Sequence, residues 1–142
     1  PEWEEFYQHA VKHGIDRLLA GDYKDYDTSI SAQLLLASLR LLIDCARSLP
    51  GYSNLHVSIM KSMSGDITYA FVAIDGSLIS FQEGSHISGN SLTVIINSIV
   101  GCLNLRCFFY SLYPYEDFEK RRKFQEFAAM MTYGDDNLGS VS

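Results

Sequence analysis

The sequence has few of the features that mark membrane, secreted or nucleic-acid-binding proteins. It contains no apolar run long enough to cross a bilayer and no N-terminal signal segment, so we expect no transmembrane segment. The three cysteines, Cys45, Cys102 and Cys107, show no paired spacing, which indicates reduced thiols in a cytosolic setting. The net charge of −6 argues against nucleic-acid binding, unless the basic surface lies outside this segment.

What is present is enough for one modest globular core. Of the 142 residues, 47% are apolar and 13% are aromatic. The chain opens at Pro1 without an initiator methionine and stops at Ser142 in a strand-like run, so we expect a slice of a longer polypeptide. Helical periodicity alternates with hairpin signals along the chain, which predicts an α+β fold.

Local patterns predict the individual elements. Ser31 suits the N-terminal cap of a long helix, and Asp75-Gly76 between two apolar runs is a strong hairpin signal. We expect the apolar run over 90–110 to form a largely buried helix, because it is too long for one strand. Helices are predicted over residues 2–13, 32–48, 54–63, 90–110 and from Pro114 through 119–123, and strands over 17–21 (buried), 69–74, 77–81, 127–132 and 137–141.

Two adjacent carboxylates occupy a predicted tight turn near the C-terminal end, in the segment Tyr133-Gly134-Asp135-Asp136. The glycine suits a hairpin turn that needs a backbone without Cβ. Carboxylates side by side repel each other, and a fold tolerates them where a cation lies between them or water solvates them. Taken alone, such a pair is more often a solvated loop.

A second acidic pair, Asp22 and Asp27, lies in one turn after the predicted strand 17–21. Alone, this pair is more often an N-cap cluster or a solvated loop. If Asp22 meets Asp135 and Asp136 on a neighbouring strand, the carboxylates form a hard, oxygen-rich site suited to Mg²⁺ or Mn²⁺. Two ions about 3.5–4 Å apart at such a site stabilise the attacking and leaving oxygens of a phosphoryl displacement.

A third polar group combines a glycine-containing loop with one face of the following predicted helix. The loop carries Ser88 and Gly89. On the helix, Thr93 and Asn97 stand four residues apart, with Ser98 next. A loop that enters a helix in this way can present N–H groups and hydroxyls to a phosphate or a sugar. The alternative is a serine N-cap followed by two polar residues that bond to the helix backbone.

Together the three groups resemble motifs A, B and C of the viral RNA-dependent RNA polymerases. In order along the chain they read Asp-x4-Asp, Ser-Gly-x3-Thr-x3-Asn and Tyr-Gly-Asp-Asp, beginning at Asp22, Ser88 and Tyr133. The extended forms over 21–27 and 88–98 are most similar to those of positive-strand, picorna-like viruses. The resemblance covers nearly the whole chain, and three motifs in order at compatible spacings make it specific.

The resemblance implies a role for each of these residues. Asp22, the backbone carbonyl of Tyr23 and Asp135 would hold two Mg²⁺ ions, for which Mn²⁺ can substitute, and Asp136 would assist. The residues that contact the ribose of the incoming nucleotide, directly or by completing the network, would be Asp27, Asn97, Ser88, Gly89 and Thr93. A site that hydrogen-bonds the 2′-OH selects ribonucleotides, because its polar groups are left unpaired when the hydroxyl is missing.

The resemblance also implies a fold, a reaction and partners. Residues 1–142 would be a partial palm core, with an antiparallel sheet, the Tyr133–Asp136 hairpin at its centre, the strand of motif A beside it and helices packed on one face. The reaction would be RNA synthesis from ribonucleoside triphosphates on an RNA template and primer, within a viral polyprotein in the host cell cytoplasm. Fingers, thumb and the remaining palm would lie outside the segment, so we expect it to be inactive alone.

Two other interpretations stay open. A reverse transcriptase palm usually carries a bulky aromatic residue where Asp27 stands and a residue other than glycine at the position of Gly134, so the sequence argues against it. A non-catalytic α+β binding domain would leave the acidic turns as solvated loops. A long distance between Asp22 and Asp135 in the fold would favour that third interpretation.

Overall fold

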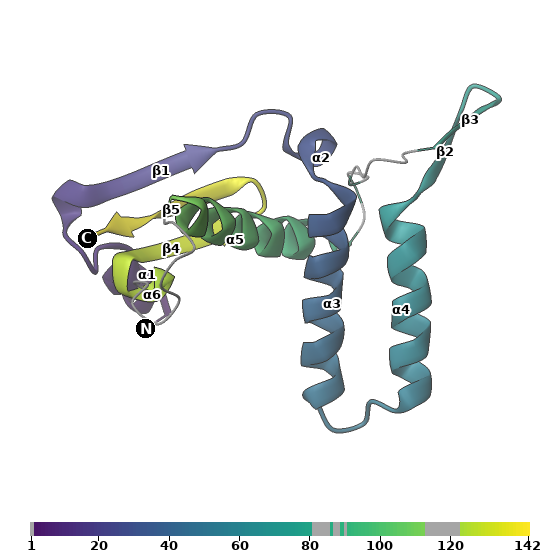
Figure 1. Cartoon of the computed structure of the whole chain (residues 1–142), viewed down its shortest axis with the longest axis horizontal. Coiled ribbons are helices and arrows are strands. Elements are labelled where there is room, and N and C mark those ends of the chain that lie inside the picture. The colour runs from purple at the N-terminus through teal and green to yellow at the C-terminus, as the bar shows by residue number, and fades with distance from the viewer. Residues whose placement is uncertain (1, 81–85, 87–88, 90, 113–122) are drawn as a thin grey trace. The chain divides into compact units, whose positions relative to one another are not determined.

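In the computed structural model, which describes residues 2–80, 86, 89, 91–112 and 123–142, the chain divides into two compact units (Figure 1). Unit 1 comprises Pro1–Lys24 and Asn97–Ser142, and unit 2 comprises Asp25–Ile96. Both units combine helices with antiparallel strands, which confirms the predicted α+β class. The helix expected from Pro114 through the basic run lies outside the described residues, except for Lys123 at its end.

The centre of unit 1 is a three-stranded antiparallel sheet in the order β1-β5-β4. Its strands are β1 (Leu18–Asp22), β4 (Ala128–Tyr133) and β5 (Asp136–Val141). β4 and β5 form a hairpin, and β1 pairs with β5, which is therefore the central strand (Figure 1). Side chains alternate between two faces. The acidic face carries Ala20, Asp22, Met131, Tyr133, Asp136 and Leu138, and the core face carries Gly21, Met130, Thr132, Asn137, Gly139 and Val141.

Helices lie against both faces of this sheet, whereas the resemblance implied packing on one face. The helices that contribute to unit 1 are α1 (Glu2–Ala10), the short η1 (Ile15–Arg17), α6 (Phe124–Phe127) and most of α5 (Thr93–Ser111). On the core face, the Thr132 hydroxyl donates to the Ser98 carbonyl of α5 at 2.7 Å. On the acidic face, α1 packs on β4 and β5, and the His13 N–H after it donates to Ser140 Oγ at 3.0 Å. Apolar side chains alternate onto both faces, so each face needs a cover.

The buried core of unit 1 lies between α5, α6 and the core face of the sheet. Phe109, Phe124 and Ala128 are buried there, and Phe109 packs edge to face on Phe124 with ring centroids 5.6 Å apart. The partly buried residues packed against them are Leu105, Phe127, Met130 and Val141. The Arg106 guanidinium lies over the Phe124 ring, 4.6 Å from its centroid, and adds a cation–π contact.

The composition of α5 differs from one expectation. With 19 residues and a mean hydropathy of 1.4, the helix is long and apolar enough to cross a membrane, in contrast to the expected absence of such a run. Packing accounts for part of this apolar character, because Val100 is fully buried and Phe109 is 4% exposed. Length and composition alone are weak evidence for a membrane span, because the core helices of soluble proteins can be equally long and apolar.

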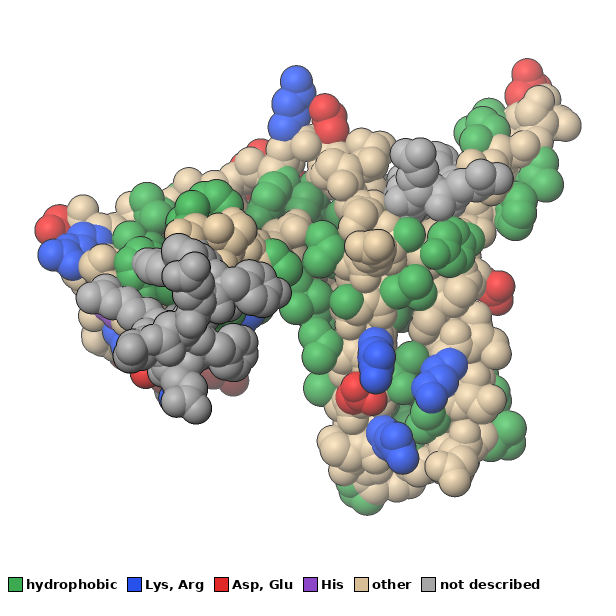
Figure 2. Space-filling model, viewed as in Figure 1, with side chains coloured by type: hydrophobic (Ala, Val, Ile, Leu, Met, Phe, Trp, Pro, Cys, Tyr) green, Lys and Arg blue, Asp and Glu red, His purple; other side chains and the backbone are tan. Residues whose placement is uncertain are grey.

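Unit 2 contains a pair of helices and a β-hairpin that follow the predicted local signals. Its elements are α2 (Tyr26–Ser29), α3 (Ala32–Ser48), α4 (Asn54–Thr68), β2 (Phe71–Ile74) and β3 (Ser77–Ser80). Ser31 caps α3 by accepting from the Leu34 N–H at 3.4 Å, as predicted. Asp75 and Gly76 form the hairpin turn with φ of 48° and 76°. Figure 2 shows Lys and Arg side chains gathered over α3 and α4, which carry the basic residues of this unit, Arg40, Arg47 and Lys61.

Four predicted elements need correction. α5 was predicted to be largely buried, but Val94, Ile95 and Phe108 are among its exposed side chains. α1 ends at Ala10, before the predicted residue 13, because the chain turns ahead of Gly14, whose φ of +118° does not fit a helix. β1 is largely exposed and was predicted to be buried; among the described strands it pairs only with β5, so one of its edges stays open. α4 continues beyond residue 63 to Thr68, whose hydroxyl donates to the Ser64 carbonyl one turn back at 2.8 Å.

Candidate active site

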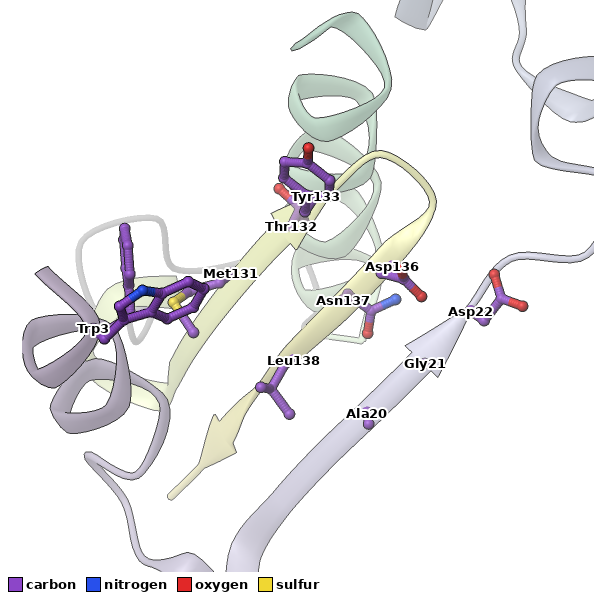
Figure 3. A pocket seen from close by; sticks show the side chains of 11 residues that line it. Trp3, Ala20, Gly21, Asp22, Met131, Thr132, Tyr133, Asp136, Asn137 and Leu138 are labelled. Carbon is purple, nitrogen blue, oxygen red and sulfur yellow. The ribbon is translucent and has the colours of Figure 1, made fainter. Parts of the chain in front are cut away.

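The strand register of unit 1 places two of the predicted acidic residues opposite each other (Figure 3). Asp22 is the last residue of β1, and its partner is Asp136, the first residue of β5. Side chains directly opposite in an antiparallel pair have Cβ atoms about 4.5–5.5 Å apart. Both residues are exposed on the acidic face. Carboxylates from opposite ends of the sequence therefore lie at neighbouring strand ends.

The turn between β4 and β5 carries the third carboxylate. Tyr133 and Asp136 are partners that flank the turn, and Gly134 and Asp135 form it. Gly134 has a φ of +62°, in the left-handed region that residues with a Cβ rarely adopt. A Cβ at Gly134 would meet nothing within 4 Å, so the backbone conformation, and not crowding, requires glycine here. The turn leaves Asp135 exposed, directly beside Asp136.

Two hydrogen bonds to Ser98 connect this turn to α5, which packs on the core face of the sheet. The Ser98 hydroxyl oxygen accepts a hydrogen bond from the Gly134 N–H at 2.8 Å, and the Ser98 carbonyl accepts one from the Thr132 hydroxyl at 2.7 Å. The sequence pattern grouped Ser98 with Asn97 as polar residues and did not indicate a contact with the turn. That contact depends on how α5 packs on the sheet, which spacing along one helix does not reveal.

An open cavity of about 870 Å³ lies beside the carboxylates in unit 1. Trp3 and Phe6 of α1 line it, with ring centroids 6.0 Å apart in an edge-to-face arrangement. The other lining residues come from all three strands and include Asp22 and Asp136 (Figure 3). Apolar walls with a few polar groups at one end are typical of ligand-binding sites. The sequence pattern did not indicate this cavity, because α1 and the β4–β5 hairpin are far apart along the chain.

The oxygen donors at this end of the sheet suit a hard divalent cation. Asp22, Asp135 and Asp136 offer carboxylates, and the backbone carbonyl of Tyr23 follows Asp22 directly. Within the described ranges, no three His, Cys, Asp or Glu side chains are grouped so that they could hold a metal ion by themselves. Mg²⁺ usually binds one or two protein carboxylates and completes its shell with water and substrate phosphates. The residues present therefore fit such an ion shared with a phosphorylated substrate.

The residues predicted to contact the ribose are divided between the two units. Thr93 opens α5 in unit 2, and Asn97, four residues later on the same helix face, begins the second segment of unit 1. Asn97 is 5% exposed. Gly89 precedes the helix with a φ of +94°, and Ser88 lies outside the described residues. The approach of this group to the carboxylates stays a prediction.

Asp27, the remaining predicted ribose contact, lies in α2 of unit 2 and is half-buried. Its backbone carbonyl accepts a hydrogen bond from the His86 N–H at 2.8 Å. His86 is buried, and burial lowers the pKa of its imidazole, an effect that the negative charge of Asp27 partly offsets. The His86 N–H thus fixes the Asp27 backbone, and burial disfavours the charged form of the imidazole.

In unit 1, burial raises the pKa of the Tyr23 phenol.

Comparison with known proteins gives matches over the entire chain. A family model described as viral RNA-dependent RNA polymerase matches residues 1–142. The chain is 31% identical over 143 residues to the RNA1 polyprotein of Arabis mosaic virus. This alignment covers 99% of the chain and 6% of that protein. It is 28% identical over 160 residues to the replicase polyprotein of Cricket paralysis virus and 27% identical over 152 residues to that of Drosophila C virus, in each case over 99% of this chain and 8% of the relative. The chain thus spans less than a tenth of the length of these relatives.

Proposed function

Because this chain belongs to the viral RNA-dependent RNA polymerase family, we propose that residues 1–142 form part of the catalytic palm of a picorna-like viral RNA polymerase. The observation that carries the proposal is the pairing of Asp22 with Asp136 at the strand ends beside the Gly134-Asp135 turn. Exposed carboxylates from separate segments, held side by side next to a cavity, suit the charge stabilisation that phosphoryl transfer requires.

The proposed reaction extends the 3′ end of an RNA primer along an RNA template. The 3′-hydroxyl oxygen attacks the α-phosphorus of a ribonucleoside triphosphate and loses its proton to water. The bond from this phosphorus to the bridging oxygen breaks, and pyrophosphate leaves. Asp22, the Tyr23 carbonyl and Asp135 would hold the divalent ions, with Asp136 assisting. When bound, Mg²⁺ or Mn²⁺ supplies positive charge beside the attacking and leaving oxygens. The carboxylates would orient that charge.

Selection of ribonucleotides is assigned to the polar group around α5 and α2. Asp27 and Asn97 would contact the ribose hydroxyls, and Ser88, Gly89 and Thr93 would complete the network. The burial of Asn97 supports this role, because a buried amide discriminates strongly against a substrate that lacks its hydrogen-bonding group. The hydrogen bond from the His86 N–H supports the fixed position of the Asp27 backbone.

The complete activity requires more of the polymerase than this chain. The relatives are viral polyproteins of which the chain spans less than a tenth, so we propose that the rest of such a polyprotein supplies the fingers, the thumb and the remaining palm. The partners would be the RNA template, the primer and ribonucleoside triphosphates. The proposed location is the host cell cytoplasm, where these components meet in a replication complex.

The test replaces Asp135 by Asn in the intact polymerase and measures primer extension with ribonucleotides and, separately, with deoxynucleotides. Removing the negative charge should lower kcat by about 100-fold or more, while the melting temperature stays unchanged. Asp75→Asn is the matched control, because Asp75 also lies in a two-residue hairpin turn, in unit 2, and its change should leave activity intact.

Two results would contradict the proposal. Near-normal RNA synthesis by Asp135→Asn would remove the turn carboxylate from the chemistry. Equal use of deoxynucleotides by the wild-type polymerase would support a reverse transcriptase instead.

A further inference from the structure

We propose that Ser98 is a positioning residue that sets the place of the Gly134-Asp135 turn, so that α5 determines where the Asp135 carboxylate stands. The proposal rests on the function proposed above and adds a residue to which the polymerase motifs assign no role. Ser98 would not touch substrate or metal; it would act through the backbone of the turn.

The geometry that points to Ser98 is a pair of hydrogen bonds between this one residue and the β4–β5 hairpin. The Gly134 N–H donates to Ser98 Oγ at 2.8 Å, one residue before Asp135. The Thr132 hydroxyl donates to the Ser98 carbonyl at 2.7 Å, two residues before Gly134. Both bonds join segments more than thirty residues apart in the sequence, so neither is a local feature of the turn.

Among the described residues, few contacts restrain the turn beyond the pairing of Tyr133 with Asp136 that closes it. A Cβ at Gly134 would have no neighbour within 4 Å, and Asp135 and Tyr133 are both exposed. Glycine is also the residue with the greatest backbone freedom. A hydrogen bond from the backbone N–H of this glycine to a side chain of α5 therefore restricts the backbone of the turn. Asn97, the proposed ribose contact, is the neighbour of Ser98 on the same helix, so one element holds both groups.

The experiment compares Ser98→Ala, Ser98→Thr and Ser111→Ala in the intact polymerase. Ser98→Ala removes the acceptor of the Gly134 N–H, and Ser98→Thr keeps a hydroxyl at the same position. Ser111→Ala is the matched control on α5, because the Ser111 hydroxyl donates within its own helix, to the Phe108 carbonyl at 2.7 Å. The measurements are kcat and KM for single-nucleotide addition, the Mg²⁺ concentration at half-maximal rate, and the melting temperature.

The expected result for Ser98→Ala is a fall in kcat of about 5- to 10-fold, a higher Mg²⁺ requirement and a KM for the nucleotide within about twofold of wild type. Ser98→Thr should recover most of kcat and the Mg²⁺ dependence, and Ser111→Ala should equal wild type. A general loss of stability would instead lower the active fraction without moving the Mg²⁺ dependence.

Two outcomes overturn the positioning role. The first is a Ser98→Ala enzyme with wild-type kcat and Mg²⁺ dependence. The second is a Ser98→Thr enzyme as impaired as Ser98→Ala at a wild-type melting temperature. Either result leaves the proposed function standing if Asp135→Asn is inactive in the same assay. An active Asp135→Asn enzyme would instead remove the proposed function itself.

Discussion

Gly139, in the central strand β5, is a position at which one methyl group should disrupt the sheet. A Cβ there would meet the backbone carbonyl oxygen of Ala129 and would stand 2.7 Å from the Cα and 2.8 Å from the Sδ of Met130. Two of these three atoms belong to the β4 backbone and cannot rotate away, so β4 and β5 would have to separate. Overpacking of this kind costs about 1–3 kcal/mol, which exceeds the gain of less than about 1 kcal/mol from a stiffer unfolded chain.

Gly65 provides the matched control for this change. It lies inside α4, where a Cβ would meet nothing within 4 Å. Alanine is the better helix former, so Gly65→Ala should stabilise α4 by about 0.5–1 kcal/mol. The same substitution at the two glycines is therefore expected to have opposite effects on stability.

Amide hydrogen exchange on the intact polymerase measures both effects locally. A loss of about 1–3 kcal/mol in the β4–β5 hairpin corresponds to exchange about 5- to 150-fold faster in Gly139→Ala, at tenfold per about 1.4 kcal/mol. Gly65→Ala should slow exchange in α4 and leave the hairpin unchanged. Wild-type exchange rates in β5 of Gly139→Ala would refute the close approach of the two strands at Gly139.

Two further predictions concern unit 2. Asp27→Ala should lower the preference of the intact polymerase for ribonucleotides over deoxynucleotides by about 10-fold or more. The measurement is the ratio of the two kcat/KM values. Asp44→Ala is an exposed control on α3 and should leave this ratio unchanged. Burial lowers the pKa of His86 below its ordinary value of about 6.5. The unfolded chain therefore binds the proton more tightly than the folded chain does. The stability that neutral His86 contributes is present above about pH 6.5 and is lost as the pH falls below that value. His86→Gln should therefore flatten the decline of melting temperature between about pH 6.5 and 5, and a decline equal to that of wild type would contradict the burial argument.

Local chemistry made parts of the fold predictable from the sequence. The Ser31 cap and the Asp75-Gly76 turn were predicted correctly, because each depends on a few adjacent residues whose backbone preferences are strong. The Gly134 turn belongs to the same class. The order of the three motifs also indicated the family, which the match over residues 1–142 confirms.

Features that depend on packing between distant segments could not be predicted in this way. The exposure of β1 follows from its place at the edge of the sheet, and the pattern of its own residues resembles that of a buried strand. The contact of Ser98 with Gly134 and the cavity beside Trp3 depend on how α5 and α1 approach opposite faces. Such approach is set by the summed packing of many side chains, and no spacing along one element reports it.

The most direct test of the proposed metal site is Mn²⁺ binding to the intact polymerase with a non-hydrolysable ribonucleoside triphosphate, followed by electron paramagnetic resonance. We expect Asp22→Asn and Asp135→Asn each to weaken binding by about 10-fold or more, because carboxylates from β1 and from the β4–β5 turn would share the ions. Asp75→Asn should bind as wild type does. Wild-type Mn²⁺ affinity in both Asp22→Asn and Asp135→Asn would contradict the convergence of these strands on a metal site.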